Sequence, residues 1–126
     1  MKQITVFSLA LILLWSCKEE EGNVNTISLG LDVQSSFDQD NVQIKIDNRE
    51  IMNRHLQTNN LLGVCDYGRI NIKLTEGKHV IKIVINKWTT KTEVFSLSKA
   101  LYIGVNYFEQ TKEIALIYSD QPFGYD

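Results

Sequence analysis

The chain has 126 residues, with 13 basic and 15 acidic side chains and a formal net charge of −2. This near-neutral balance, with no basic patch and no acidic tail, argues against a nucleic-acid-binding protein. The length suits one domain of ordinary size with a hydrophobic core of its own.

The N-terminus has the pattern of a secretory signal. Lys2 is followed by a mostly apolar run of 12 residues, Ile4 to Trp15. A run of this length is too short to cross a bilayer as a helix, which takes about 20 apolar residues, but it fits the apolar region of a signal peptide. Ser16 precedes Cys17 and is small, as signal peptidase requires of the residue before the cleavage site. We therefore predict a signal peptide over residues 1–16.

The order Leu14-Trp15-Ser16-Cys17 resembles the lipobox of bacterial lipoproteins, although a small residue is usual where Trp15 stands. The run that follows, Lys-Glu-Glu-Glu at 18–21, is similar to the acidic export tag of Bacteroidetes-type surface lipoproteins. The resemblance implies that the Cys17 thiol is lipidated, with acyl chains such as palmitate, and becomes the mature N-terminus. Stable anchoring then needs two or more acyl chains. The location implied is the outer membrane, facing the cell surface.

Two alternatives to this interpretation stay open: an ordinary cleaved signal peptide with an incidental cysteine, and an uncleaved membrane anchor. Residues 17–25 are mostly charged and polar, which is typical of a flexible tether, and residues 26–126 are expected to form the domain. If Cys17 is acylated, Cys65 has no disulfide partner. Cys65 ends an apolar run that begins at Leu61, so we expect it in the core.

The domain shows apolar residues at every second position, the pattern of half-buried strands. The clear strands are 27–34, 42–47, 70–74, 79–85, 92–97, 101–107 and 114–118. The stretch 49–57 is weaker and fits either a short edge strand or a helical turn, and 61–65 is another short strand candidate. Asp47-Asn48 and the Gly77 turn separate strands, because such residues accept positive φ angles.

Seven to nine short strands separated by turns favour an all-β fold: an antiparallel two-sheet β-sandwich. The segments 42–47, 74–83 and 94–97 resemble the hairpin pattern of PEGA-type and transthyretin-like (Ig-like) modules. The Pro-Glu-Gly-Ala opening of that family is absent here, and the insert at 49–69 is long. The resemblance implies the fold and says little about activity.

Few residues carry a chemical signal. His55 and His79 lack the spacing of a zinc site, and a surface position is expected for His79 after its turn. Asp38, Asp40 and Asn41 share one loop, where a solvated turn is favoured over a calcium site because the EF-hand order is missing. No nucleophile elbow or phosphate loop is present. We therefore expect no enzymatic activity, no metal and no cofactor.

Four aromatic residues are candidates for a ligand-binding surface: Trp88, Tyr102, Phe123 and Tyr125. Tyr102 falls on the side of its strand opposite the expected core. The favoured alternative is structural, with Trp88 capping one end of the sandwich and the last two aromatics pinning down the end of the chain.

Taken together, the sequence predicts a lipid-anchored envelope protein that acts as a non-enzymatic binding or scaffolding module. The partner is the membrane, through the anchor, together with a protein or a glycan. Two alternatives stay open: an envelope-bound inhibitor or accessory subunit of an outer-membrane complex, and an enzyme whose site forms only in three dimensions.

Overall fold

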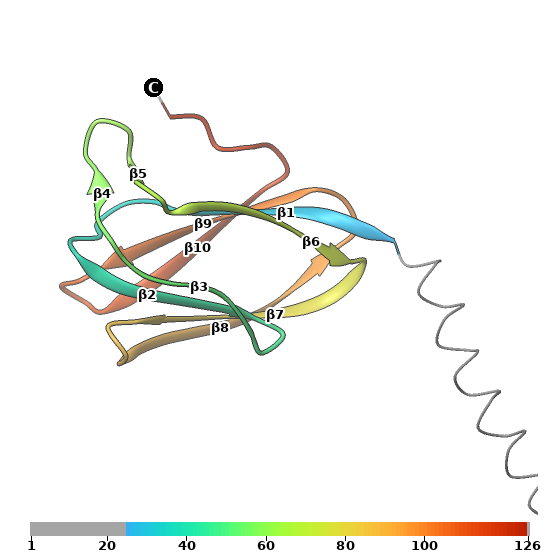
Figure 1. Ribbon diagram of the computed structural model, residues 1–126, viewed down its shortest axis with the longest axis horizontal. Helices are drawn as coiled ribbons and strands as arrows, with labels where there is room; N and C mark the ends of the chain where they lie inside the picture. Colours follow the sequence, from blue (N-terminus) through green and yellow to red (C-terminus); the bar gives the residue numbers. More distant parts are fainter. Residues whose placement is uncertain (1–24, 126) are drawn as a thin grey trace, which may run out of the picture.

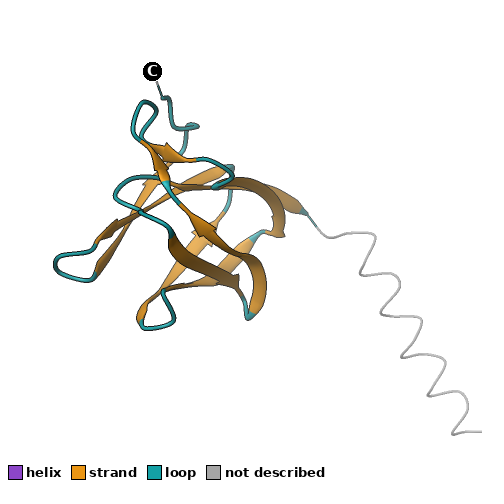
Figure 2. Cartoon of the chain, turned by 60° about the vertical axis from the view of Figure 1, so that its left-hand side comes forward, coloured by secondary structure: helices purple, strands orange, loops and turns teal. Residues whose placement is uncertain are grey.

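The computed structural model describes residues 25–125, which form two four-stranded β-sheets and one small hairpin (Figures 1 and 2). The predicted signal peptide and Cys17 lie outside the described residues. Between residues 25 and 125 there is no helix long and apolar enough to cross a membrane. The expectation of an all-β, two-sheet sandwich is confirmed.

Sheet A contains, in spatial order, β10 (Glu113–Ser119), β9 (Leu101–Phe108), β1 (Thr26–Val33) and β6 (Arg69–Thr75). Sheet B contains β3 (Arg49–Leu56), β2 (Asp40–Ile46), β7 (Gly77–Ile85) and β8 (Thr89–Leu97). A separate hairpin pairs β4 (Thr58–Asn59) with β5 (Val64–Cys65). The ten described strands exceed the expected seven to nine by one: the candidate at 61–65 appears as β5, and β4 is the additional short strand. The weak stretch at 49–57 is an edge strand, not a helical turn.

The core lies between the sheets and follows from the alternation. Leu29, Leu31 and Val33 of β1 face inward, as do alternate isoleucines of β7, and all are fully buried. Burial of each such side chain contributes roughly 1.5–3 kcal/mol. Cys65 is a buried free thiol, as expected, and burial raises its pKa above the ordinary value. The stability of the domain therefore rests on packing.

The sandwich has two different ends. At the N-terminal end, β1 begins and the short turns at 47–48, 76 and 98–100 lie together (Figure 1). At the other end, which we call the loop end, lie the four loops 34–39, 57–68, 86–88 and 109–112. Backbone hydrogen bonds hold parts of this end together: the Thr58 nitrogen donates to the Phe37 carbonyl (3.0 Å), and the Asn86 nitrogen donates to the Asn41 carbonyl at the start of β2 (2.8 Å).

One strand pair departs from the antiparallel expectation. β1 and β9 are neighbours in sheet A and run parallel, with Leu31 opposite Ile103. The reason is topological: β8 ends at the N-terminal end, so β9 must start there, where β1 also starts. Alternation along a strand gives its buried face and not its neighbour, so the sequence could not predict this pair.

Candidate functional site

The outer face of sheet A buries polar side chains, which a solvated outer face does not ordinarily do. Asp32 on β1 and Asn106 on β9 are only 6% and 7% exposed, and Gln34, just after β1, is 8% exposed. All three occupy outward positions, because their neighbours Leu31, Val33 and Val105 point into the core. Buried groups of this kind need partners, and their partners define the site.

Two glycines make the floor of this region. A Cβ on Gly104 would collide with the carboxamide of Gln34, and a Cβ on Gly30 would lie 2.6 Å from Cδ1 of Tyr102. Both glycines stand at outward positions of neighbouring strands, so the missing side chains leave a hollow on the sheet surface. The side chains of Gln34 and Tyr102 lie flat in that hollow.

An amide network fixes Gln34. Asn106 Nδ2 donates to Gln34 Oε1 at 2.9 Å, and Asn106 Oδ1 accepts from the backbone nitrogen and the hydroxyl of Ser35 at 3.1 and 2.6 Å. The acceptor of Gln34 is therefore used within the network. Its amino group is left to point outward as a donor.

The chain after β10 folds back over this hollow, and we call residues 120–125 the covering segment (Figure 1). The hydroxyl of Tyr125 donates to Asp32 Oδ2 at 2.7 Å and accepts from Gln34 Nε2 at 2.8 Å. The Arg69 guanidinium lies 5.2 Å from the centre of the Tyr125 ring, and its Nε is 3.4 Å from Asp32 Oδ2. Burial and the Asp32 hydrogen bond raise the pKa of Tyr125 to about 12, so the hydroxyl keeps its proton at neutral pH.

A shallow pocket of about 430 Å³ lies beside this contact. Its lining includes Asp32, Arg69, Tyr102 and Phe123. Three of the four aromatic candidates, Tyr102, Phe123 and Tyr125, thus lie on one face of sheet A. We call the group Asp32, Gln34, Arg69, Tyr102 and Asn106 the Tyr125 site. It holds a carboxylate, two amides, a guanidinium and an aromatic ring, which suits a hydroxyl-bearing aromatic group.

Trp88 is not part of this site. It stands in the β7–β8 turn at the loop end and is 88% exposed, so the expectation that it caps the sandwich is wrong. The turn projects beyond the sheets because Asn86 and Lys87 take positive φ angles and reverse the chain in two residues. The expectation that the last aromatics pin down the chain is met by Tyr125.

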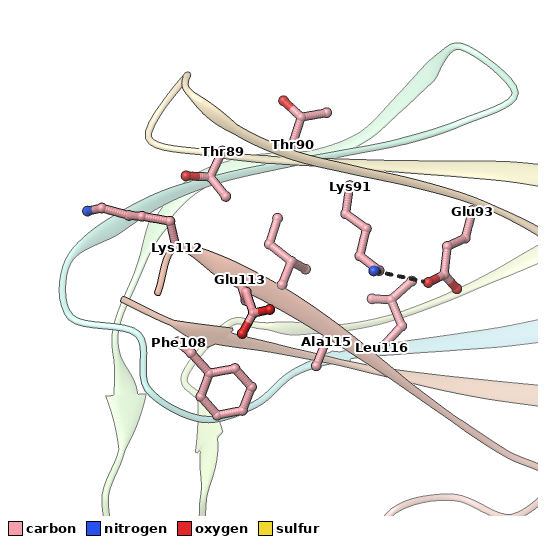
Figure 3. Close-up of a pocket in the computed structure, with 10 residues that line it drawn as sticks. Thr89, Thr90, Lys91, Glu93, Phe108, Lys112, Glu113, Ala115 and Leu116 are labelled. Atoms are coloured by element: carbon pink, nitrogen blue, oxygen red, sulfur yellow. Dashed lines mark ion pairs between the residues drawn. The ribbon is translucent and has the colours of Figure 1, made fainter. Parts of the chain in front are cut away.

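The seam between the edge strands β8 and β10 forms a second hollow, of about 510 Å³ (Figure 3). Two of its charged groups form an ion pair, with Lys91 Nζ 3.4 Å from Glu93 Oε2, and the Tyr118 hydroxyl donates to Glu93 Oε1 at 2.6 Å. Burial and the hydrogen bond to Glu93 raise the pKa of Tyr118. Inward charges on an edge strand discourage pairing with another chain, so these groups suit protection of the edge.

His79 differs from its expectation. It is buried, 6% exposed, and stacks on Phe95 at 5.7 Å, because its position on β7 faces inward. Its Nδ1 lies 2.6 Å from Asp47 Oδ2 and its Nε2 lies 2.6 Å from the Thr75 carbonyl. Burial alone would lower the pKa of His79, but these two hydrogen bonds raise it overall. The pair ties the β2–β3 turn to the β6–β7 turn.

The remaining metal candidates have structural partners. Asp40 accepts from the Asp38 backbone nitrogen (2.8 Å) and from Asn86 Nδ2 (2.8 Å), so it links two loops. His55 is exposed on β3. Among residues 25–125, no three side chains of the metal-binding types are grouped closely enough to hold an ion.

Sequence reasoning missed Asp32, Gln34, Arg69 and Asn106 as site residues, because outward polar positions on a strand are ordinarily solvated. The only available signal was the pair of glycines at outward positions, Gly30 and Gly104, beside these residues. Comparisons with protein-family models, with curated proteins and with solved structures gave no match.

Proposed function

We propose that this protein is a surface-facing, outer-membrane lipoprotein that binds a protein partner through the loop end of its β-sandwich, without catalysing a reaction. The anchor is a lipidated Cys17, and residues 17–25 are the tether. The resemblances to lipoprotein signals and to PEGA-type modules support this proposal.

The observation that carries the proposal is the placement of exposed apolar side chains. Nine large hydrophobic side chains are exposed in the described domain, and five of them belong to the loop end or its margin. These five are Leu61, Leu62, Tyr67, Trp88 and Phe108. They stand on separate connections at this end, and exposed aromatic and aliphatic side chains are typical of protein-binding surfaces.

The geometry of attachment agrees with this role. The tether joins β1 at the N-terminal end, and the loop end lies at the opposite end of the sandwich (Figure 1). A lipid anchor at Cys17 would attach the domain by the end opposite the loop end. The alternative function, an accessory subunit of an outer-membrane complex, would use the same end to bind the rest of the complex.

The anchor is tested by Cys17→Ala followed by cell fractionation and labelling with a radioactive fatty acid. We expect the variant to lose the label and leave the membrane fraction. A variant that stays with the membrane contradicts the lipid anchor.

The binding surface is tested by crosslinking and pull-down from native membranes with the wild type, with Trp88→Ala and with Val94→Ala. Val94 is 63% exposed on the outer face of sheet B and serves as the matched control. We expect Trp88→Ala to lose a partner that the control retains, at an unchanged melting temperature. Equal recovery with both variants, or no partner at all, contradicts the proposal.

A further inference from the structure

The covering segment is held mainly by the side chain of Tyr125. Among the described residues, no backbone hydrogen bond joins positions 122–125 to sheet A, and the hydrogen bonds of these positions to the sheet are those of the Tyr125 hydroxyl. At the start of the segment, Asp120 makes an exposed ion pair with Lys99 at 3.8 Å, and the Ser119 hydroxyl hydrogen-bonds to the backbone of Gln121. Because these contacts are few, the segment can detach without loss of any strand pairing.

The site beneath the segment is built without it. Asp32 stands on β1 and Asn106 on β9, and the Asn106–Gln34 and Asn106–Ser35 hydrogen bonds are internal to sheet A and its adjoining loop. When the segment leaves, the carboxylate of Asp32 and the amino group of Gln34 remain in place as an acceptor and a donor. They lose their only shared partner, so the open site favours a new hydroxyl.

We propose that the Tyr125 site is an exchangeable peptide-binding site, which takes residues 119–125 of a second copy of this chain when its own segment is released. The structure displays the fit of this occupant directly, since the same segment fills the site within one chain. The recognised group is a phenol hydroxyl that donates once and accepts once, with its ring beneath the Arg69 guanidinium. This inference is independent of the function proposed above.

Exchange depends on local concentration. A segment joined to its own site by a short linker is present there at an effective concentration on the order of 1 mM. A second copy competes only when its own local concentration approaches that value. Mutual exchange between two copies would form a symmetric pair with the same contact made twice, and such symmetry is the commonest among homodimers.

The site is tested with a fluorescent peptide of residues 119–125 and the full chain carrying Tyr125→Ala, which leaves the site empty. We expect the peptide to bind this variant, and the same peptide with phenylalanine in place of its tyrosine to bind about tenfold more weakly, because the Asp32 carboxylate then loses its hydroxyl donor and keeps only Arg69. Wild-type chain should bind less peptide than the variant. Absence of binding at about 1 mM peptide, or equal binding of the two peptides, overturns the proposal.

Exchange between copies is tested by mixing two variants and measuring mass by analytical ultracentrifugation. Asp32→Ala has an intact segment and a defective site, whereas Tyr125→Ala has an intact site and a defective segment. We expect each alone to be a folded monomer that unfolds in one cooperative transition, and the mixture to form a one-to-one complex. A mixture that stays monomeric while the peptide binds contradicts the second copy as occupant.

Discussion

The two outer faces of this sandwich are built differently. On sheet B the outward side chains of β7 and β8 are mostly exposed, among them Lys78, Lys82 and Thr92. On sheet A, by contrast, outward Asp32 and Asn106 are buried beneath Gln34, Tyr102 and the covering segment. An outer face that is only a boundary with water needs no buried carboxylate, so the difference marks sheet A as the face that is organised around an occupant.

The largest expected effect comes from a matched pair of asparagines, one on each outer face. Asn106→Ala should reduce the free energy of unfolding by about 2–3 kcal/mol, because it leaves the Ser35 backbone nitrogen and Gln34 Oε1 unpaired. Asn53→Ala on the exposed face of sheet B should change it by less than about 0.5 kcal/mol. Urea denaturation of both variants measures this. Equal effects would mean that the faces do not differ.

A pair of glycines gives the next effect. Gly104→Ala forces the buried Gln34 side chain out of its place and should cost about 1–3 kcal/mol of unfolding free energy. Gly124→Ala in the covering segment meets no atom within 4 Å and should be nearly neutral. Thermal unfolding of both variants checks the prediction. A neutral Gly104→Ala would show that Gln34 moves freely.

Removal of one hydroxyl should have a smaller effect. Tyr125→Phe should lower the free energy of unfolding by about 0.5–1.5 kcal/mol, the usual contribution of a hydrogen bond. It should also make the covering segment cleavable by protease at low enzyme concentration. Tyr67→Phe, at a position 82% exposed, is the control and should change neither quantity. Limited proteolysis that cuts both variants alike would contradict the anchoring role of Tyr125.

The smallest effect is a dependence of stability on pH, which arises at the N-terminal end of the sandwich and not at the Tyr125 site. The pKa of His79 is raised above its unfolded value, so its stabilising contribution is present below about pH 6.5 and is lost as pH rises through the folded pKa. The pKa of Asp47 is lowered, mainly by the His79 hydrogen bond, so its contribution is lost as pH falls through that lowered value. The total should be about 1 kcal/mol at most, because the Asp47 carboxylate is about half exposed and is screened.

Melting temperatures from pH 5 to pH 8.5 measure this response. His79→Gln should flatten the profile, whereas His55→Gln, at an exposed position, should leave it unchanged. A slope that survives His79→Gln would place the titrating group elsewhere.

The sequence predicted much of the fold, because alternation fixes which side chains of β1, β2, β7 and β9 enter the core. It also predicted that Tyr102 points away from the core. The parallel pairing of β1 with β9 could not be predicted from the sequence, because strand neighbours depend on the path of the whole chain. The same limit hid the Tyr125 site: residues 32, 34 and 106 look solvated until Tyr125, 93 residues from Asp32, is placed over them.

The burial of His79 and the exposure of Trp88 illustrate a second limit. A histidine beside a turn is expected at the surface, but Asp47 from another turn supplies a partner that allows His79 to be buried. An aromatic residue in a loop is expected to cap the sandwich, but the loop of Trp88 projects from the sheets. The burial of His79 thus depends on a contact between distant segments, which no local pattern encodes.

The covering segment is joined to Asp32 through the hydroxyl of Tyr125. A double-mutant cycle between Asp32→Ala and Tyr125→Phe, followed by urea denaturation, gives the strength of this link. We predict a coupling free energy of about 0.5–1.5 kcal/mol, the usual contribution of a hydrogen bond. Effects that add to within about 0.3 kcal/mol would show that the two residues do not interact and would contradict the account.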